Sequence, residues 1–252
     1  MQIAFSKFIE DYKVILGKSL SENDWILEIP LKKIKLFQET LSKADKRKFN
    51  EALVEQSLSE MLQYLDEVIK DVAERQGKKV KSLVINGPDI HIVPDVYQKL
   101  ISSLVHLARN SVTHGIEMPY DRVARGKEEA AQISINLSDL KIDDKPNFQM
   151  IFADDGLGIN IEGLRKKIMS TIPSAQSWTK EKILQRLLTE GQSSKDQSDM
   201  DGGRGVGIRA VYEEVLRLGG HMHIQTDSGQ GSRFIIEIPY LDELTTPQNK
   251  VA

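Results

Sequence analysis

The chain of 252 residues contains no cysteine, which excludes disulfide bonds and thiolate-ligated metal sites and is typical of a reducing compartment. No uninterrupted apolar run approaches the roughly 18 residues that a membrane-spanning helix needs. Residues 1–7 also lack the basic and then apolar order of a signal peptide. Basic residues are not in excess, since the net charge is -3, and no basic run is interleaved with aromatic residues. We therefore expect a cytoplasmic protein that contacts neither nucleic acid nor membrane.

Residues 1–76 show helical periodicity and no strand pattern. Apolar residues recur at helical spacing in 5–16 and again in 31–41, and residues 44–76 contain neither Gly nor Pro. This last segment predicts one long amphipathic helix, with an apolar stripe of Phe49, Leu53, Leu58, Leu62, Leu65, Ile69 and Val72. Helical stripes of this length bury little surface alone. We assign residues 1–68 to a helical region that forms a homodimer or links to the next domain.

Strand and helix patterns mix from residue 79 onward. Strands are predicted near 81–86, 132–138, 148–153, 221–226 and 232–238, and helices near 94–114, 161–171, 179–189 and 206–219. Residues 227–231 predict a hairpin turn, and the polar segment 140–147 predicts a solvated connection. The predicted fold is α+β, one sheet with helices on one face, in a domain over residues 69–244 that is followed by a disordered tail, 245–252.

The predicted helix over 94–114 carries the most informative polar residues. Its apolar positions repeat at helical spacing. His106 and Asn110 lie four residues apart on one face, which Thr113 and His114 continue. The helix therefore presents an imidazole, an amide and a hydroxyl beside a buried stripe. A half-buried polar helix, satisfied within the fold, is the alternative for this segment alone.

Two glycine clusters come later in the chain. The first directly follows a strand pattern and reads Asp154-Asp155-Gly156-Leu157-Gly158. The second directly precedes a helix pattern and reads Gly202-Gly203-Arg204-Gly205-Val206-Gly207. Glycine fits where the backbone turns sharply or approaches a ligand closely, and the amides at a helix N-terminus can bind phosphate. A single cluster is usually a turn, but the order of Asn-bearing helix, first cluster and second cluster is far more specific.

In this order the segments resemble the catalytic ATP-binding domain of the chemotaxis-type (CheA) histidine kinases. That domain is part of the GHKL ATPase superfamily, which includes gyrase, MutL and the heat-shock chaperone ATPases. The resemblance runs from about Ile69 to Leu241. The chemotaxis branch is indicated by His114-Gly115-Ile116-Glu117 and by Arg122-Val123-Ala124-Arg125-Gly126-Lys127. The resemblance implies a two-layer α/β sandwich of the Bergerat type, ATP and Mg²⁺ as cofactors, and a lid loop between about 172 and 204.

The resemblance also implies roles for single residues. Asn110 matches the residue whose amide oxygen ligates Mg²⁺, a hard cation that prefers oxygen ligands. Asp154 matches the carboxylate that accepts a hydrogen bond from the adenine amino group, because a carboxylate accepts and does not donate. Gly156 and Gly158 let the backbone pass beside the base. His106 matches an imidazole that orients the transferred phosphoryl group or moves a proton, so His106 and Asn110 are the expected catalytic residues.

The second glycine cluster is expected to close the lid on the phosphates. Gly203, Gly205 and Gly207 match the glycines that permit this closure, and Arg204 either adds charge there or is a surface residue. The other cofactor-binding residues that the resemblance implies are His114, Ser193, Val206 and Ser232. For His114 a structural role is the alternative, whereas Ser232 keeps the hydroxyl of a position where the family commonly has Thr.

Three positions depart from the family pattern. Thr113 stands where Asp is frequent, Gln192 where Phe is expected, and Arg209 where Asp is usual. They lie beside the expected ligands, so they bear on rate and lid closure more than on nucleotide binding. They support one rival function, a degenerate ATP-binding regulatory module without phosphotransfer. A second rival, a GHKL protein-serine kinase or ATPase, is disfavoured by segments 114–117 and 122–127.

Histidine is absent before His91, so the predicted N-terminal helices cannot carry a phosphoacceptor histidine. The resemblance then implies that the acceptor belongs to a separate phosphotransfer domain, which either precedes Met1 in a longer protein or is supplied by another protein. The expected function is transfer of the ATP γ-phosphoryl group to that histidine in two-component signalling, with a response regulator as an indirect partner.

Overall fold

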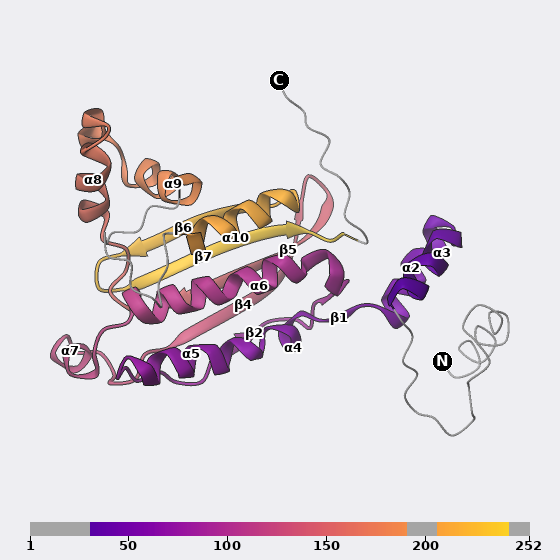
Figure 1. Ribbon diagram of the computed structural model, residues 1–252, viewed down its shortest axis with the longest axis horizontal. Coiled ribbons are helices and arrows are strands. Elements are labelled where there is room, and N and C mark those ends of the chain that lie inside the picture. Colours follow the sequence, from indigo (N-terminus) through magenta and orange to yellow (C-terminus); the bar gives the residue numbers. More distant parts are fainter. Residues whose placement is uncertain (1–30, 191–205, 242–252) are drawn as a thin grey trace. The chain divides into compact units, whose positions relative to one another are not determined.

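The computed structural model describes residues 31–190 and 206–241 (Figure 1). The chain forms two compact units, residues 1–54 and 55–252, and each is described by itself. Within the described ranges, no helix combines the length and the apolar character that crossing a membrane requires.

The described part of the first unit is a pair of helices, α2 (Leu31–Thr40) and α3 (Lys43–Leu53). Their apolar faces meet at Phe37 and Phe49, whose ring centroids are 5.4 Å apart. Helix α2 was predicted as an apolar stripe over 31–41, and α3 was predicted as the beginning of a longer helix over 44–76. The predicted stripe over 5–16 lies outside the described residues.

The prediction of one long helix over 44–76 is wrong. The structure has instead α3, then β1 (Gln56–Ser57), α4 (Leu58–Leu62) and α5 (Tyr64–Arg75). The break has a local cause, because the Ser57 hydroxyl accepts a hydrogen bond from the Glu60 N–H at 3.4 Å and so begins a new helix. Strand β1 also pairs antiparallel with β3 (His91–Ile92), which a continuous helix could not do.

The apolar stripe nevertheless continues across the break. Its later members are at most 6% exposed and lie in the core of the second unit: Leu58, Leu62, Leu65, Ile69 and Val72. These five residues therefore pack within the chain and are not a surface that a partner could cover.

A five-stranded mixed sheet organises the second unit. Its strands, in spatial order, are β2 (Val84–Asn86), β4 (Ile133–Ile142), β5 (Lys145–Asp154), β7 (Gly231–Pro239) and β6 (His221–Asp227). The pair β2–β4 is parallel, and the other neighbours are antiparallel. Residues alternate between buried and exposed along β6, as expected for a sheet that is covered on one face.

Helices cover that face of the sheet. Figure 1 shows α5, α6 (Pro94–Asn110) and α10 (Val206–Arg217) lying across it. The core between the two layers contains fully buried residues from both of them, among them Leu104, Leu107, Phe152, Val211 and Ile236. Three shorter helices lie toward one end of the sheet: α7 (Pro119–Ala124), α8 (Ile161–Met169) and α9 (Lys180–Glu190). The predicted α+β, two-layer fold is confirmed.

The segment 140–147, predicted as a solvated connection, is largely exposed, but it is not an irregular loop, because β4 and β5 continue through it. They are joined by a two-residue turn at Asp143 (φ 49) and Asp144 (φ 59). Two left-handed residues match the twist of a tight hairpin, and Asp tolerates this conformation better than most residues. The predicted hairpin turn over 227–231 is confirmed, since Asp227 pairs with Gly231 across it.

Candidate functional site

Asp154 is a buried carboxylate at the last position of β5. Its Oδ1 accepts a hydrogen bond from the Gly156 N–H at 3.0 Å, and its Oδ2 accepts one from the Ser111 hydroxyl at 3.2 Å. The N–H of Ser232, on the paired strand β7, donates a third. These three donors are uncharged, so neutral dipoles hold the carboxylate.

Burial raises the pKa of Asp154 from the ordinary 3.8 to about 6. The hydrogen bonds from Gly156, Ser111 and Ser232 lower this pKa, and the neighbouring charge of Asp155 raises it. The ionised carboxylate is thus less stable here than in water, and one more N–H donor would stabilise it. Such a group can recognise the amino edge of a heterocycle, because it accepts hydrogen bonds there.

The turn after β5 packs closely against the segment that follows α6. The Leu157 N–H donates to the Gly115 carbonyl at 2.7 Å. A methyl group on Gly156 would overlap that carbonyl and lie 3.0 Å from Asp154 Oδ1. Only glycine permits this approach, so the first glycine cluster is required by packing around the carboxylate.

Ser232 belongs to a buried hydroxyl cluster on the other side of Asp154. Its Oγ lies 3.2 Å from Thr226 Oγ1. Thr226 donates to the Gly231 carbonyl at 2.9 Å and accepts from the Ile159 N–H at 2.9 Å. A Cβ atom on Gly158, whose φ is +75°, would lie 2.9 Å from Thr226 Oγ1 and 3.1 Å from the Gly231 carbonyl oxygen, so the turn packs directly against the cluster. The cluster therefore fastens the turn after Asp154 to the β6–β7 hairpin.

Helix α6 continues into one π-helical turn, η1 (Ser111–Gly115). In this turn the Ile116 N–H donates to the Ser111 carbonyl at 2.8 Å, across five residues. Lys78 fastens the turn from outside, because its ammonium donates to the carbonyls of Val112 and Thr113 at 2.6 and 2.8 Å. Such turns are frequent at functional sites. Here the turn brings the Ser111 hydroxyl onto the Asp154 carboxylate.

His106 and Asn110 lie where the start of α10 meets α6. A Cβ atom on Gly207 would lie 2.8 Å from Asn110 Nδ2 and 2.9 Å from His106 Cβ, so the backbone of α10 passes directly over both residues. His106 is exposed and Asn110 is half-buried. An imidazole and an amide are therefore available beside a helix N-terminus, which is a suitable place for phosphate and a cation.

A magnesium ion would need few protein ligands at this place. In the described part of the chain, no group of three His, Cys, Asp or Glu side chains could hold a metal. Mg²⁺ commonly keeps several waters and binds through one or two protein oxygens together with substrate phosphates. A single amide oxygen from Asn110 fits that kind of coordination.

A network of ion pairs with a buried centre lies next to the Asp154 turn. It consists of Glu117, Arg122, Lys127 and Asp155. Arg122 donates to Glu117 Oε2 at 3.0 Å and to Asp155 Oδ2 at 2.8 Å, and Lys127 donates to Glu117 Oε1 at 2.9 Å. The side chains of Arg122 and Glu117 are only 1% and 3% exposed. Burial alone would raise the pKa of Glu117, but the Lys127 hydrogen bond and the two positive charges bring that pKa below its usual range.

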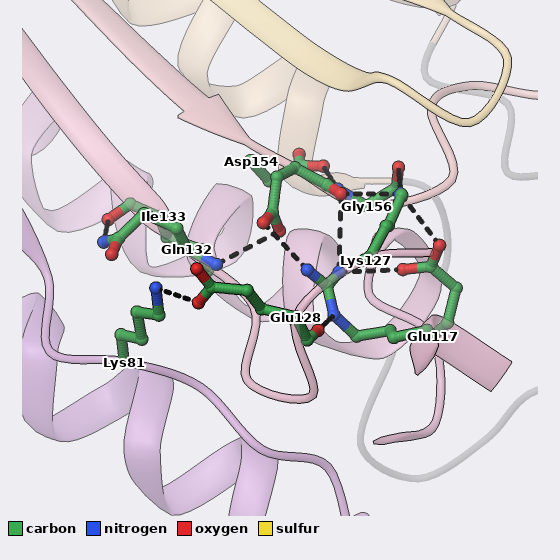
Figure 2. A network of polar contacts seen from close by, with 10 residues as sticks. Lys81, Glu117, Lys127, Glu128, Gln132, Ile133, Asp154 and Gly156 are labelled. Carbon is green, nitrogen blue, oxygen red and sulfur yellow. Dashed lines mark hydrogen bonds and ion pairs between the residues drawn. The ribbon is translucent and has the colours of Figure 1, made fainter. Parts of the chain in front are cut away.

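The ion-pair network also forms hydrogen bonds with the backbone of the turn that follows Asp154. Figure 2 shows Lys127 between Glu117 and the Gly156 turn. Its ammonium donates to the carbonyls of Asp155 and Gly156 at 2.7 and 2.6 Å, so its three donors have three acceptors. On the other side, Asp155 Oδ1 accepts from the Gln132 N–H at 3.1 Å. The turn that carries the buried carboxylate is therefore held by charged groups.

The structure brings the predicted site residues together around two places. The first place is where α10 meets α6, and it contains His106, Asn110 and Gly207. The second place is at the end of β5 and the start of β7, and it contains Asp154, Gly156, Gly158 and Ser232. The two places are linked along the chain, because Asn110 directly precedes Ser111. His114 is exposed on η1, and Val206 is the first residue of α10. Four further predicted residues lie outside the described residues: Ser193, Gly203, Arg204 and Gly205.

Sequence reasoning missed several residues of this site. Ser111 and Thr226 carry hydroxyl groups that long-range pairing brings to Asp154 and Ser232. Segments 114–117 and 122–127 were interpreted as family markers, but their ionic partners were not predicted. A charged residue in a sequence is usually a surface residue, and only the fold shows that Arg122 is buried.

Two of the three departures make contacts away from the carboxylate. The Thr113 hydroxyl accepts a hydrogen bond from the Gln76 side chain at 2.9 Å. Arg209 forms an exposed ion pair with Glu213, four residues later on α10, at 2.7 Å. Gln192 lies outside the described residues.

Comparison with known proteins gives one family. Residues 99–242, more than half of the chain, match the family described as histidine kinase-, DNA gyrase B- and HSP90-like ATPase. The chemotaxis protein CheA of Listeria monocytogenes is 34% identical over 176 residues, which are 68% of this chain and 28% of that protein. CheA of Rhizobium meliloti is 30% identical over 190 residues, which are 75% of this chain and 24% of that protein.

The chain thus spans about a quarter of the length of the curated relatives it matches. Among solved structures, the histidine kinase domain of a blue-light activated histidine kinase from Erythrobacter litoralis aligns with a TM-score of 0.44 and 13% identity. That alignment covers 93% of this chain and 96% of that one.

Proposed function

We propose a function for this chain, which belongs to the histidine kinase-, DNA gyrase B- and HSP90-like ATPase family over residues 99–242. The proposed function is that of the ATP-binding catalytic domain of a chemotaxis-type histidine kinase. The observation that carries this proposal is the buried Asp154 carboxylate, which only neutral donors hold.

At the base end of the site, Asp154 accepts a hydrogen bond from the adenine amino group. The Ser111 hydroxyl and the N–H groups of Gly156 and Ser232 each use one lone pair of the carboxylate. A carboxylate offers about four acceptor positions, so one remains for the base. The acceptor also discriminates between bases, because guanine presents a carbonyl oxygen at the corresponding edge. Two acceptors would then face each other without a proton between them.

At the phosphate end, the amide oxygen of Asn110 ligates Mg²⁺, and His106 lies one helical turn earlier on the same face. A bound magnesium ion neutralises charge on the phosphates. The protein's part in phosphoryl transfer is mainly to position groups and to stabilise charge. The family resemblance assigns lid closure to Gly203, Gly205 and Gly207 and nucleotide contacts to Arg204 and Ser193, and of these residues Gly207 lies within the described part of the chain.

The acceptor of the phosphoryl group is a histidine on a separate phosphotransfer domain, from which a response regulator is phosphorylated. Two facts support this choice. The relatives are chemotaxis proteins, and residues 1–90 contain no histidine. The first unit supplies a homodimer contact, because it exposes Leu36 and Leu53 at 63% and 46%.

Calorimetric titration with Mg-ATP tests the site. We expect wild type to bind Mg-ATP. Asp154→Asn should bind it about 10- to 100-fold more weakly, because a hydrogen bond to a charged group is lost. In Asn110→Ala, ATP binding should no longer depend on magnesium. Asp71→Asn is the matched control, because that carboxylate pairs with Arg75 on the exposed side of α5. Equal affinity of wild type and Asp154→Asn would refute the assignment.

A second candidate function is an ATP-binding regulatory module that does not transfer phosphate. Thr113 favours it, because its hydroxyl is bonded to Gln76 at a position where the family often has a carboxylate. Labelled γ-phosphoryl transfer to a chemotaxis-type phosphotransfer domain distinguishes the two. A chain that binds ATP and transfers no label to any such domain is the regulatory module.

A further inference from the structure

The peptide unit between Asp155 and Gly156 is contacted at both of its polar ends. Its carbonyl oxygen accepts from Lys127 Nζ at 2.7 Å and from Arg122 Nη1 at 3.4 Å. Its N–H group, which belongs to Gly156, donates to Asp154 Oδ1 at 3.0 Å. A trans peptide is planar and holds these two groups in opposite directions. Whatever fixes the carbonyl therefore also fixes the direction of the N–H.

Two cations thus lie at one end of this peptide and an anion at the other. The positive charges polarise the carbonyl, which makes the N–H a stronger donor, because hydrogen bonds in a chain reinforce one another in a low-dielectric interior. Glu117 keeps the cations in place, since its two oxygens accept from Lys127 and from Arg122. The two cations therefore act on the Asp154 carboxylate through the peptide, and neither of them contacts it.

We infer that Lys127, held by Glu117 and Arg122, is a positioning residue for adenine recognition and acts on Asp154 through the Asp155–Gly156 peptide. The inference rests on the proposed role of Asp154 in binding adenine. It extends that role to side chains that make no contact with the base. The ion-pair network thereby sets how readily the carboxylate accepts a hydrogen bond.

The other groups around Asp154 belong to different elements, so their effects on its carboxylate can be separated from that of Lys127. The η1 turn contributes the Ser111 hydroxyl, and β7 contributes the Ser232 N–H, both uncharged. Asp155 is the adjacent charge that acts on the carboxylate, and its own side chain is paired with Arg122. Removing the Lys127 charge therefore changes the Gly156 hydrogen bond while these groups remain.

The test is nuclear magnetic resonance on the full chain without nucleotide. The side-chain carboxyl carbon of Asp154 and the amide proton of Gly156 are followed between about pH 4.5 and 8.5. In wild type both should titrate together with a midpoint near the pKa of about 6. Lys127→Met should move that midpoint upward by about one pH unit, the size expected for weakening a hydrogen bond to a charged group.

Three further variants decide the interpretation. Lys127→Arg keeps the charge and should restore most of the wild-type midpoint. Lys79→Met removes a lysine charge from an exposed pair with Glu129 and should leave the midpoint unchanged. Where Lys127→Met does not fold, Lys127→Gln, which keeps a donor and loses the charge, must also raise the midpoint. A wild-type midpoint and an unchanged Gly156 amide in the neutral variants would overturn the inference.

Calorimetry with ADP separates this inference from the proposed function. With midpoints of about 6 and 7, Lys127→Met should bind ADP about threefold more weakly than wild type near pH 6.5 and equally well near pH 8.5. Recovery at high pH is not expected of a variant that is merely misfolded. A wild type that binds no ADP would refute the proposed function, and the resonance titration would still decide whether the network acts on Asp154.

Discussion

The base end and the phosphate end of the proposed nucleotide site are built differently. At the base end, Asp154, Glu117 and Arg122 are buried and have hydrogen-bond partners within the domain. At the phosphate end, His106 is exposed, Asn110 is half-buried, and the neighbouring residue is Gly207. The domain completes its base end with its own contacts. We infer that its phosphate end is completed by the ligand, the metal and the incoming acceptor.

This difference agrees with the two tasks that we propose for the site. Recognition of a base needs one acceptor at a fixed place, which packing can supply before the ligand arrives. Transfer of a phosphoryl group to another protein needs open access to the γ-phosphate. Each of the following substitutions tests whether the two ends can be changed separately.

The largest expected effect is on the rate of transfer. His106→Gln should slow phosphotransfer to a supplied acceptor domain by about 10²- to 10⁴-fold, the usual contribution of a group that moves or orients a proton. The affinity for ADP should stay near wild type, because the base end is intact. Labelled-phosphate transfer and ADP calorimetry measure the two effects, and equal transfer rates would make His106 a structural residue.

Breaking the ion-pair network should affect folding stability strongly. Arg122→Met removes one of the two cationic partners of the buried Glu117 and should lower the free energy of unfolding by about 3–5 kcal/mol. The matched control is Arg209→Met, which breaks the exposed pair with Glu213 and should cost about 0.5 kcal/mol or less. Urea unfolding measures both, and similar losses would contradict the contrast between buried and exposed pairs.

The base end should also carry a pH-dependent stability cost. The pKa of Asp154 is raised to about 6 in the fold from the ordinary 3.8, so between these values the native state holds more protons than the unfolded chain. Stability then falls as pH rises through this window, and the cost is complete above it. Asp154→Asn should therefore stabilise the nucleotide-free protein by up to about 3 kcal/mol near pH 8 and by little near pH 4. A difference that does not vary with pH would refute this.

A smaller effect is expected where α10 approaches α6. Gly207→Ala places a methyl group 2.8 Å from Asn110 Nδ2 and 2.9 Å from His106 Cβ. We expect Mg-ATP to bind about tenfold more weakly, because overpacking of this kind costs about 1–3 kcal/mol. In an Asn110→Ala background the same substitution should cost less, because only the close contact with His106 Cβ remains, as a double-mutant cycle would show. Full additivity would mean that the methyl group does not act through Asn110.

Much of the fold could be predicted from hydrophobic periodicity, and the errors have local causes. The break in the predicted long helix is marked by Ser57 and Glu60, a pattern that begins helices and that the apolar stripe obscured. Strands were predicted near β4 and β5, but their extension to a tight turn was missed because the polar residues between them suggested a loop. Asp143 and Asp144 are, however, residues that a tight turn accepts.

The site could be predicted only in part. Asn110 and Asp154 stand in patterns that specify their surroundings, a polar helix face and a glycine turn after a strand. The bond between Ser111 and Asp154 joins residues 43 positions apart, and no local pattern encodes it. The same is true of Arg122 and Asp155, whose pairing follows from the closure of the whole domain.

The π-helical turn η1 determines how the chain after α6 is rotated about the helix axis relative to His106 and Asn110. An α-helix turns by about 100° per residue, so deleting one residue from 111–115 would rotate everything after α6 by about that angle. The Gly115 carbonyl would leave the Leu157 N–H, while His106 and Asn110 kept their places on α6. The number of residues in this turn, as much as their identity, therefore keeps the residues proposed to bind the base aligned with those proposed to bind the phosphates.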